Sequence, residues 1–588
     1  MKAFLARHGF IFVLAAIIGG FIIAPTVLAI LRMDGGFRGV YPMFSNDEDQ
    51  YLAMTQEVAD GHFNLGSPYL SEHKDEPYLQ PPAAEIIFAE TAGALHISVP
   101  ELFALNDFAL PFCGVILLYF LLYEVVESPM VAAFFAVLYY ALLIGPFNRP
   151  INPQFSFLFL FGGVLVSWEI LKERIGSFRK MIAWNFLLAV IFGVAFYIYP
   201  FVWTSIVAVY GVTAFLLAVK ERSWMYYLQN MFFFAVPAFL FSMPFLWNLK
   251  SAMANPNYVA ENLRFGFLFT HWPAAYLNVA IMAACLVLMY LVSGIAADKK
   301  GAFGYSLALS GVILNWQNVI TGRAFSFSMH YYWVVILFAC IVFAIAAVSI
   351  VSDFKKRSVT YRGWAALALA VIVLLGILYR QSGDIAFGFG GFVNQSPTGT
   401  FESQQQFADV ADWLNAHTSR DASIYSLGGN YTQLIPVYTH DNDFYNANAG
   451  LFLISDDELE NRWVIQNFFR SDITAAYVED HSVEIWANKF IERYQNQVIR
   501  NKIISLITGV QQPAVELVPQ EYIDRVLAKV QAYQKLGFEK AIREYPVDYI
   551  VLDTGDPEYG SLADAFRHMP SLHLAATPGN NLIFSVVK

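Results

Sequence analysis

The sequence predicts a polytopic α-helical membrane protein with a mixed α/β domain at its C-terminal end. Of its 588 residues, 57% are hydrophobic and only 14% are charged, which is more apolar surface than a water-soluble core can bury. Stretches of about 20 apolar residues, the length that crosses a hydrocarbon layer as a helix, recur as far as residue 379. Beyond residue 400 the chain is polar and acidic instead.

Eleven apolar stretches predict membrane-spanning helices. They are residues 10–31, 101–123, 130–146, 152–171, 182–199, 201–219, 230–249, 273–293, 303–320, 331–352 and 361–379. The two stretches that meet at Pro200 leave almost no loop, so short or broken helices are expected there. The first stretch lacks a small-residue cleavage site and is too long for a signal peptide, so it is expected to remain as an anchor.

Lys and Arg residues predict the orientation of these spans, because positive charge in short loops tends to stay in the cytoplasm. With the N-terminus inside, the inner loops receive "LKERIGSFRK", "KERSW", "ADKKG" and "DFKKRSVTYR", whereas the short outer loops hold single cations. The expected protein is therefore a multi-pass protein of a cell membrane, of the prokaryotic inner-membrane type. Its N-terminus would be cytoplasmic and its C-terminal domain extracytoplasmic.

Composition divides the chain into three parts. We predict a transmembrane module over 1–380 with a long first external loop at 32–100, a Gly-rich linker at 381–399 and a soluble domain at 400–588. From residue 400 onward there are 25 Asp and Glu against 14 Lys and Arg, a difference equal to the whole chain's net charge of −11. This acidity argues against nucleic acid as a partner. All three cysteines lie in apolar stretches, so no disulfide is expected in the domain.

Within the C-terminal domain, "FADVADWLNAH" has helical periodicity, and "ASIYSLGG" and "VDYIVLD" are typical of buried strands. Ser455 and Glu458 have the spacing of a helix capping box. No nucleotide-binding, hydrolase or metalloprotease motif is present. The cluster "THDNDFYNANAG", with His440, Asp441 and Asp443, fits either a ligand or ion site or a polar turn between two strands.

Three consecutive acids, Asp47, Glu48 and Asp49, follow the first span at the start of the long external loop. Ser45 and Glu48 match a capping box, acids favour the first turn of a helix, and Gly61 is a natural residue to follow the helix end. A capped helix explains Glu48 but not the place of the motif at the opening of the longest loop. Long external loops of compact proteins are more often functional than idle.

The order of motifs resembles the GT-C glycosyltransferases, especially the branch that contains protein O-mannosyltransferases and the aminoarabinose transferases of lipid A. Here a retained first span is followed by "DEDQY", then "QEVADGHF", then "PYLQPPAAE". In that branch the first loop commonly begins D-E-x-x-Y, continues through an acid and a Gly-aromatic pair, and reaches K-P-P. The matching residues are Asp47, Glu48, Tyr51, Glu57, Gly61, Pro81 and Pro82.

The resemblance implies transfer of a sugar from a polyprenyl-phosphate donor to a glycan, lipid or protein acceptor on the outer side of the membrane. Such a reaction needs a carboxylate to accept the acceptor's proton and a cation to hold the developing phosphate charge. We assign the base role to Asp47, and expect substrate contacts from Glu48, Asp49, Tyr51 and Gln80. A one-step displacement inverts the sugar configuration and needs no nucleophilic residue.

One departure from the family matters. Where the resemblance implies a lysine before the two prolines, this chain has Gln80, which brings no charge to a donor phosphate. The predicted replacements are the external cations Arg149, Arg264, His271, Arg323 and His330. Each of them also fits an ordinary residue of the lipid interface.

No cofactor is required by this chemistry, although a divalent metal is compatible with it. The loop offers hard oxygen ligands and an imidazole, in Asp47, Asp49, Glu72, His73, Asp75 and Glu76. The "SEHKDE" segment that contains the last four of these also fits a solvated loop.

Two other classes of protein stay open. A transporter or flippase of lipid-linked glycans would carry internal repeats and ionisable residues within spans, of which only isolated cases such as Asp107 and Glu169 occur. A non-catalytic membrane scaffold would leave the first-loop motif as a capped helix. The sugar, the acceptor and the oligomeric state are not encoded in any motif that we identify.

Overall fold

The computed structural model describes residues 2–44, 47–172, 177–294, 298–325, 329–355, 360–394 and 399–587. The chain forms two compact units, each built from segments that lie far apart in the sequence. The first unit contains Met1–Leu28, Phe103–Leu246 and Phe269–Ser396. The second contains Ala29–Leu102, Trp247–Leu268 and Pro397–Lys588, so the first external loop belongs to the same unit as the C-terminal region.

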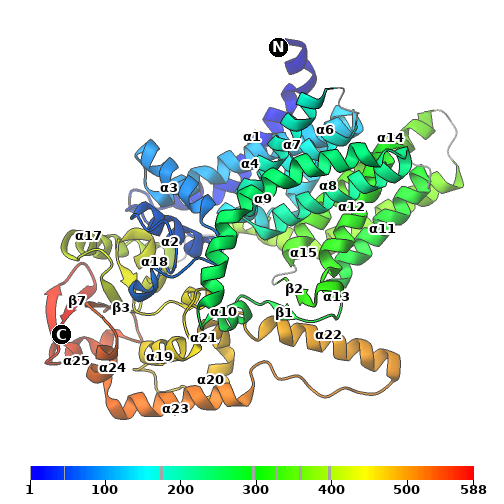
Figure 1. Cartoon of the computed structure of the whole chain (residues 1–588). Helices are drawn as coiled ribbons and strands as arrows, with labels where there is room; N and C mark the ends of the chain where they lie inside the picture. Colours follow the sequence, from blue (N-terminus) through cyan, green and yellow to red (C-terminus); the bar gives the residue numbers. More distant parts are fainter. Residues whose placement is uncertain are drawn as a thin grey trace. The chain divides into compact units, whose positions relative to one another are not determined.

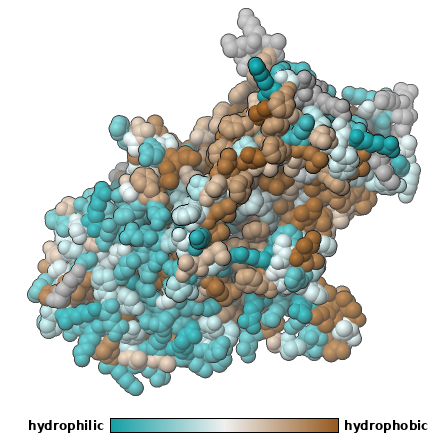
Figure 2. Space-filling model, in the orientation of Figure 1, coloured by the Kyte–Doolittle hydropathy of each residue, from teal (hydrophilic) through white to brown (hydrophobic). Residues whose placement is uncertain are grey.

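The first unit is a bundle of long helices (Figure 1). They are α1 (Lys2–Arg32), α4 (Val99–Val126), α5 (Pro129–Leu142), α6 (Ser156–Lys172), α7 (Phe178–Phe196), α8 (Pro200–Glu221), α9 (Trp224–Ala254), α11 (Tyr276–Ser293), α12 (Lys299–Trp316), α14 (Met329–Lys355) and α15 (Tyr361–Asn394). Shorter elements are η2 (Pro146–Asn148), η3 (Pro150–Phe155), α13 (Asn318–Thr321) and the paired strands β1 (Leu268–Phe269) and β2 (Arg323–Ala324). Figure 2 shows apolar surface over the long helices, as expected of helices that face lipid.

Each of the eleven predicted spans coincides with a helix, and nine helices in the described ranges are long and apolar enough to cross a membrane. The prediction of eleven spans is therefore too high by this measure. α5 has only 14 residues, and α12 contains Lys299, Lys300 and Asn315, which lower its hydropathy. The expectation of short or broken helices around Pro200 is wrong, since α7 and α8 both reach spanning length.

The Gly-rich segment 381–399 also differs from its prediction as a linker. α15 continues as a helix to Asn394, and residues 395–398 lie outside the described part of the chain. Inside the bundle, α14 is the most enclosed span, with 78% of its apolar window buried. It packs against α11 and α12, as expected of a helix that is hydrophobic all round.

The second unit contains a five-stranded sheet in the order β4-β3-β5-β7-β6. The strands are β3 (Ser423–Leu427), β4 (Asn442–Asp443), β5 (Tyr549–Asp553), β6 (Leu572–Ala576) and β7 (Asn581–Val586). β4, β3 and β5 are parallel, and β7 is antiparallel to both β5 and β6. The two predicted strands are confirmed as β3 and β5, and the predicted mixed α/β character is confirmed with them.

The second unit also contains many helices. They are α2 (Glu48–Ala59), α3 (Ala83–Leu95), α10 (Tyr258–Arg264), α16 (Gly399–Gln404), α17 (Phe407–His417), α18 (Tyr431–Tyr438), α19 (Asp456–Gln466), α20 (Ala475–Asp480), α21 (Ser482–Trp486), α22 (Ile491–Thr508), α23 (Gln520–Leu536), α24 (Phe538–Ala541) and α25 (Ala563–Arg567). Single turns are η1 (Ser71–His73), η4 (Ala447–Leu451), η5 (Ile542–Glu544) and η6 (Gly560–Leu562). The predicted N-cap is confirmed at α19, where Ser455 Oγ accepts the Glu458 N–H at 3.1 Å. The Glu458 side chain, the other half of the predicted capping box, contacts His73 and Arg462 instead.

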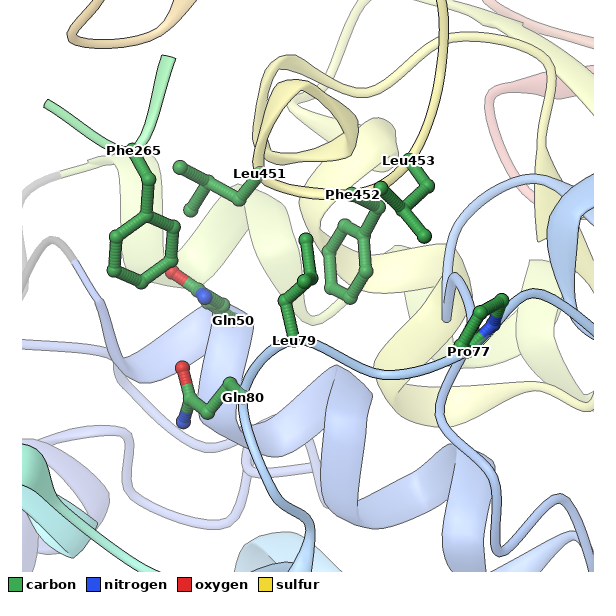
Figure 3. A pocket seen from close by; sticks show the side chains of 9 residues that line it. Gln50, Pro77, Leu79, Gln80, Phe265, Leu451, Phe452 and Leu453 are labelled. Atoms are coloured by element: carbon green, nitrogen blue, oxygen red, sulfur yellow. The ribbon is translucent and has the colours of Figure 1, made fainter. Parts of the chain in front are cut away.

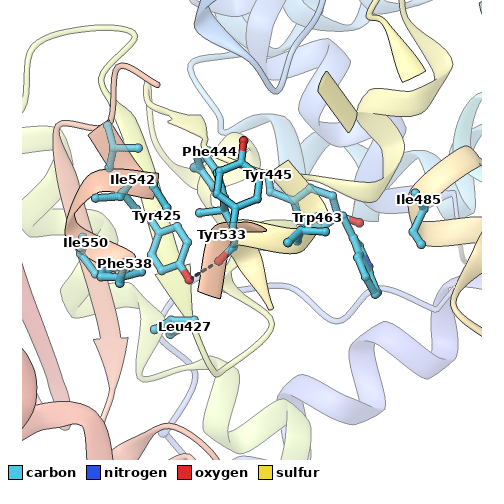
Figure 4. Packing of buried hydrophobic residues seen from close by; sticks show 14 of the residues in the cluster. Tyr425, Leu427, Phe444, Tyr445, Trp463, Ile485, Tyr533, Phe538, Ile542 and Ile550 are labelled. Carbon is cyan, nitrogen blue, oxygen red and sulfur yellow. Dashed lines mark hydrogen bonds between the residues drawn. The ribbon is translucent and has the colours of Figure 1, made fainter. Parts of the chain in front are cut away.

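Two apolar cores cover opposite faces of the sheet, because successive strand residues point to opposite sides. Tyr425 and Leu427 of β3 belong to the larger core, together with Trp463 and Phe538 (Figure 4). Ile424, between them in sequence, belongs to the other core. That second core also takes in Val40 and, at its edge, Met43. The chain just before the first-loop acids is thus fixed to the sheet by packing.

Candidate functional site

The first-loop acids lie at the N-terminus of α2. Asp47 is the N-cap residue, and its side chain makes no capping hydrogen bond to the helix. Glu48 instead accepts the Phe44 N–H at 2.8 Å. The described helix begins at Glu48, and Ser45, the other residue of the predicted capping box, lies outside the described residues. The predicted helix end is confirmed, since Gly61 follows the C-cap residue with a φ of +106°.

Asp49 is turned into the unit and is only 9% exposed. One carboxylate oxygen accepts from Asn448 Nδ2 at 3.2 Å, and the other has no hydrogen-bond partner among the described residues. Burial raises the pKa of Asp49 to about 6, because removal from water disfavours the charged form. Tyr51, on the same helix, is also buried. A buried carboxyl group with a raised pKa thus lies within the motif, in the first turn of α2.

The polar cluster predicted as a ligand site or a turn lies beside this carboxyl group. Asn442 and Asp443 form β4 rather than a turn, and Asp443 is buried with one oxygen bonded to Asn446 Nδ2 at 2.8 Å. Burial raises the pKa of Asp443 well above its ordinary range. Tyr69, also buried, contacts Phe452 edge to face at 5.9 Å between ring centroids.

A small hollow is formed by two parts of the first loop, by Phe265 after α10, and by the end of η4 with the segment that follows it (Figure 3). Its lining consists of Gln50, Gly66, Pro77, Leu79, Gln80, Phe265, Leu451, Phe452 and Leu453. Gln50 follows Asp47 by three positions, so the two side chains leave α2 on the same face. No charged side chain is among these lining residues, and the amides of Gln50 and Gln80 are their only polar side chains.

A lysine of the first loop is present near Gln80 in sequence, but it has another function. Lys74 is buried, and its Nζ donates to both oxygens of Glu57 at 2.8 Å and lies 2.6 Å from Asp421. Burial raises the pKa of Glu57, and Lys74 opposes this rise. Glu57 and Lys74 thus neutralise one another inside the unit. The acid Glu57 of "QEVADGHF" therefore has a structural role, as the ion-pair partner of Lys74.

The "SEHKDE" segment is not a solvated loop throughout. Glu72 pairs with Arg462 at 2.7 Å, and His73 lies 3.1 Å from Glu458, so the segment is fastened to α19. Asp75 is exposed. Within the described ranges, no three His, Cys, Asp or Glu residues lie close enough together to hold a metal ion. The predicted metal ligands are not assembled in this part of the chain.

Arg264 does not fit its predicted role as a ligand of the donor phosphate. It is fully buried, and Nη1 pairs with Asp456 at 2.5 Å. Its Nε and Nη2 donate to the carbonyl oxygens of Gly450, Phe452 and Ile454 at 2.6–2.9 Å. The guanidinium therefore fastens the end of α10 to η4 and the start of α19, a structural role that only the folded chain reveals.

Two other predicted cations are brought together in the first unit. Arg149 Nη1 lies 3.4 Å from His330 Nε2, and its guanidinium lies over the Trp333 ring at 5.4 Å. Since arginine can only donate, His330 Nε2 accepts this hydrogen bond. The ring proton is therefore on His330 Nδ1, which donates to the hydroxyl oxygen of Tyr199. His330 is therefore neutral in this arrangement and orients Arg149.

The remaining predicted cations are exposed. His271 Nδ1 lies 3.0 Å from the Val319 carbonyl oxygen, and Arg323 lies over the Phe269 ring at 5.8 Å. Both fit the alternative that they are ordinary residues of the lipid interface.

The two acids noted within spans each have a partner. Asp107 accepts from Gln154 Nε2 at 2.9 Å. Glu169 pairs with Lys172 at 2.5 Å.

Sequence reasoning missed Glu85 as a candidate. It lies in the first turn of α3 and is 1% exposed. Within the described ranges, neither of its carboxylate oxygens has a hydrogen-bond partner. Burial raises its pKa to about 7. The available signal was its place in the helical stripe formed with Phe88, Ala89 and Ala92, where an acid interrupts an apolar pattern.

No protein-family model matches the sequence, and no curated protein sequence matches it. Among solved structures, the chain is similar to the crystal structure of ArnT from Cupriavidus metallidurans bound to undecaprenyl phosphate. The alignment covers 96% of this chain and 98% of that chain, with 11% sequence identity and a TM-score of 0.46.

Proposed function

We propose that this protein is an integral-membrane glycosyltransferase that moves a sugar from a polyprenyl-phosphate donor to an acceptor on the outer side of the membrane. One observation carries the proposal: Gln50 of the "DEDQY" motif and Gln80 of the "QPP" motif line the same hollow. The two stretches through which the sequence resembles sugar transferases are thereby joined at one site. A capped helix with no further role would not require this.

Asp47 is the residue of this site suited to accept a proton. It precedes Gln50 by one helical turn and is half-buried. A carboxylate so placed takes the proton from the acceptor hydroxyl or amine as the sugar is transferred. Asp49 is a further titratable group of the same helix turn, and burial raises its pKa to about 6. We assign it the role of a positioning residue, through its hydrogen bond from Asn448.

Arg149 is the cation that we assign to the phosphate of the donor. A planar guanidinium matches phosphate oxygens in pairs, and Trp333 and His330 hold this one in a fixed orientation. Arg264, the other leading candidate, is excluded by its buried pairing with Asp456. The amides of the hollow, which add no charge, suit the hydroxyl groups of a sugar or an acceptor.

The test is transfer of label from synthetic polyprenyl-phosphate sugars, with the purified full-length protein and a membrane extract as the source of acceptors. Undecaprenyl phosphate, the ligand in the ArnT crystal structure, serves as the binding probe and competitor. We expect transfer from at least one sugar donor and its inhibition by the probe. Absence of both transfer and probe binding would contradict the proposal.

A further inference from the structure

A helical arm leaves the core of the second unit at Phe490 and returns to it at Val518. Both of these residues are buried, whereas no residue in the range 491–517 is buried. The arm consists of α22 and the irregular segment that connects it to α23 (Figure 1). With 18 residues, α22 is about 27 Å long at 1.5 Å per residue. The arm therefore projects from the core instead of contributing to it.

The arm has a defined conformation. Gly509 ends α22 with a φ of +70°, and its N–H donates to the Ser505 carbonyl oxygen at 2.9 Å. The returning segment is bonded to the helix, since Asn501 Nδ2 donates to the Pro513 carbonyl oxygen at 3.1 Å. Such end caps and cross-links are those of a folded element.

Apolar side chains gather at the tip of the arm, around the last turn of α22. Leu506 is 87% exposed, Ile507 77% and Val510 61%, and these are the three most exposed large apolar residues in the described range 399–587. The tip, "IISLITGV", contains no charged residue. Side chains of this kind are normally covered, and a concentrated exposed group of them marks a contact surface.

Positive charge accompanies the tip. Arg493, Arg500 and Lys502 lie on α22, which carries a single acid, Glu492. The rest of the C-terminal region is acidic, with an excess of 11 negative charges from residue 400 onward. The arm is thus a locally basic element whose end is apolar. This combination is typical of segments that enter the interfacial layer of a bilayer, with cations at the phosphates and apolar side chains below them.

We propose that the tip of this arm inserts into the surface layer of a phospholipid bilayer. Leu506, Ile507 and Val510 would enter the acyl region, and Arg500 and Lys502 would contact lipid phosphates. The described part of this chain contains nine helices that are long and apolar enough to span a membrane. A protein embedded in this way is always in contact with a bilayer. This contact is independent of sugar transfer, and a protein without transferase activity would still make it.

The experiment uses the full-length protein in phosphatidylcholine and phosphatidylglycerol nanodiscs, with Cys113, Cys285 and Cys340 replaced by alanine. A fluorophore is placed by Thr508→Cys, which leaves the apolar residues of the tip intact. The control position is Asp564→Cys, at a side chain that is 87% exposed. Lipids carrying a nitroxide on the acyl chain should quench the label at 508 about twofold or more beyond the control, as expected for interfacial insertion.

The pair Leu506→Glu and Ile507→Glu should remove this difference. The pair Gln495→Glu and Gln497→Glu, which adds the same charge nearer the base of the arm, should retain most of it. Equal quenching at positions 508 and 564 would overturn the proposal. Protection of the label from aqueous iodide without quenching by lipid would overturn it as well, because protein rather than lipid would then cover the tip.

Discussion

Gln50 and Gln80 line one hollow although they belong to separate motifs of the first external loop. Gln80 occupies the position at which the family that this chain resembles has a lysine, and no charged side chain is among the described lining residues. Because Gln80 lines the hollow, the lack of a lysine at this position leaves the described lining of the hollow without a positive charge. It also suggests the most direct way to change the site.

Gln80→Lys should strengthen use of a phosphate-linked donor. A new charge-assisted hydrogen bond contributes roughly 1.5–3 kcal/mol, so the KM for the donor should fall about tenfold. Gln50→Lys is the matched control for added charge in the same hollow. Steady-state kinetics with a synthetic polyprenyl-phosphate sugar decides the matter, and an unchanged or higher KM for Gln80→Lys would show that the donor phosphate lies elsewhere.

Arg149→Ala should raise the KM for the donor tenfold or more, because one charged contact to phosphate is lost. Arg149→Lys should recover only part of this loss, since an ammonium group lacks the planar pair of donors. Arg323→Ala, at an exposed cation of the same unit, is the control and should behave as the wild type. Equal effects of the Arg149 and Arg323 substitutions would remove Arg149 from the mechanism.

Arg264→Ala should destabilise the protein rather than weaken donor binding. Burial alone would raise the pKa of Asp456, but Lys489 and Arg264 together lower it. Removal of one partner of such a buried pair costs about 3–5 kcal/mol, and three carbonyl groups lose their donors as well. Thermal unfolding measures this loss. A variant with wild-type stability and a raised donor KM would return Arg264 to the list of phosphate ligands.

The raised pKa of Asp49, about 6 in place of 3.8, makes stability depend on pH. The folded state holds this proton more tightly than the unfolded state does, so the contribution is fully present below about pH 4 and is lost as pH rises to about 6. The lost contribution is roughly 3 kcal/mol. Asp49→Asn should flatten this part of the profile, and its stability relative to wild type should increase from pH 4 to pH 6. Parallel wild-type and variant profiles would mean that Asp49 is ionised in the folded protein at pH 5.

Local patterns predicted the fold class, a helix at each of the eleven apolar stretches, the strands β3 and β5, and the caps at Ser455 and Gly61. Each of these depends on residues that are close in sequence. The roles of Arg264 and Glu72 were not predictable, because their partners Asp456 and Arg462 lie 192 and 390 positions away in the sequence. An arginine in an external loop has the same local pattern whether it binds a ligand or closes a buried ion pair.

Local patterns also did not predict the residue at which α2 begins. The sequence placed the cap at Ser45, whereas the helix begins at Glu48 with Asp47 as its N-cap residue. Packing of Val40 and Met43 against the second core of the sheet fixes where the chain turns into this helix. The shift brings Asp47 to the helix terminus and directs Asp49 inward, a distinction between neighbouring acids that no spacing rule supplies.

The central claim is that Asp47 accepts a proton during sugar transfer, and Asp47→Asn tests it most directly. The amide keeps the size of the side chain but accepts no proton, so turnover with a polyprenyl-phosphate sugar should fall by roughly 10²–10⁴ while thermal stability stays near wild type. Asp75→Asn, at an exposed acid of the same loop, is the matched control and should keep wild-type turnover. An Asp47→Asn protein with near-normal turnover would contradict the account.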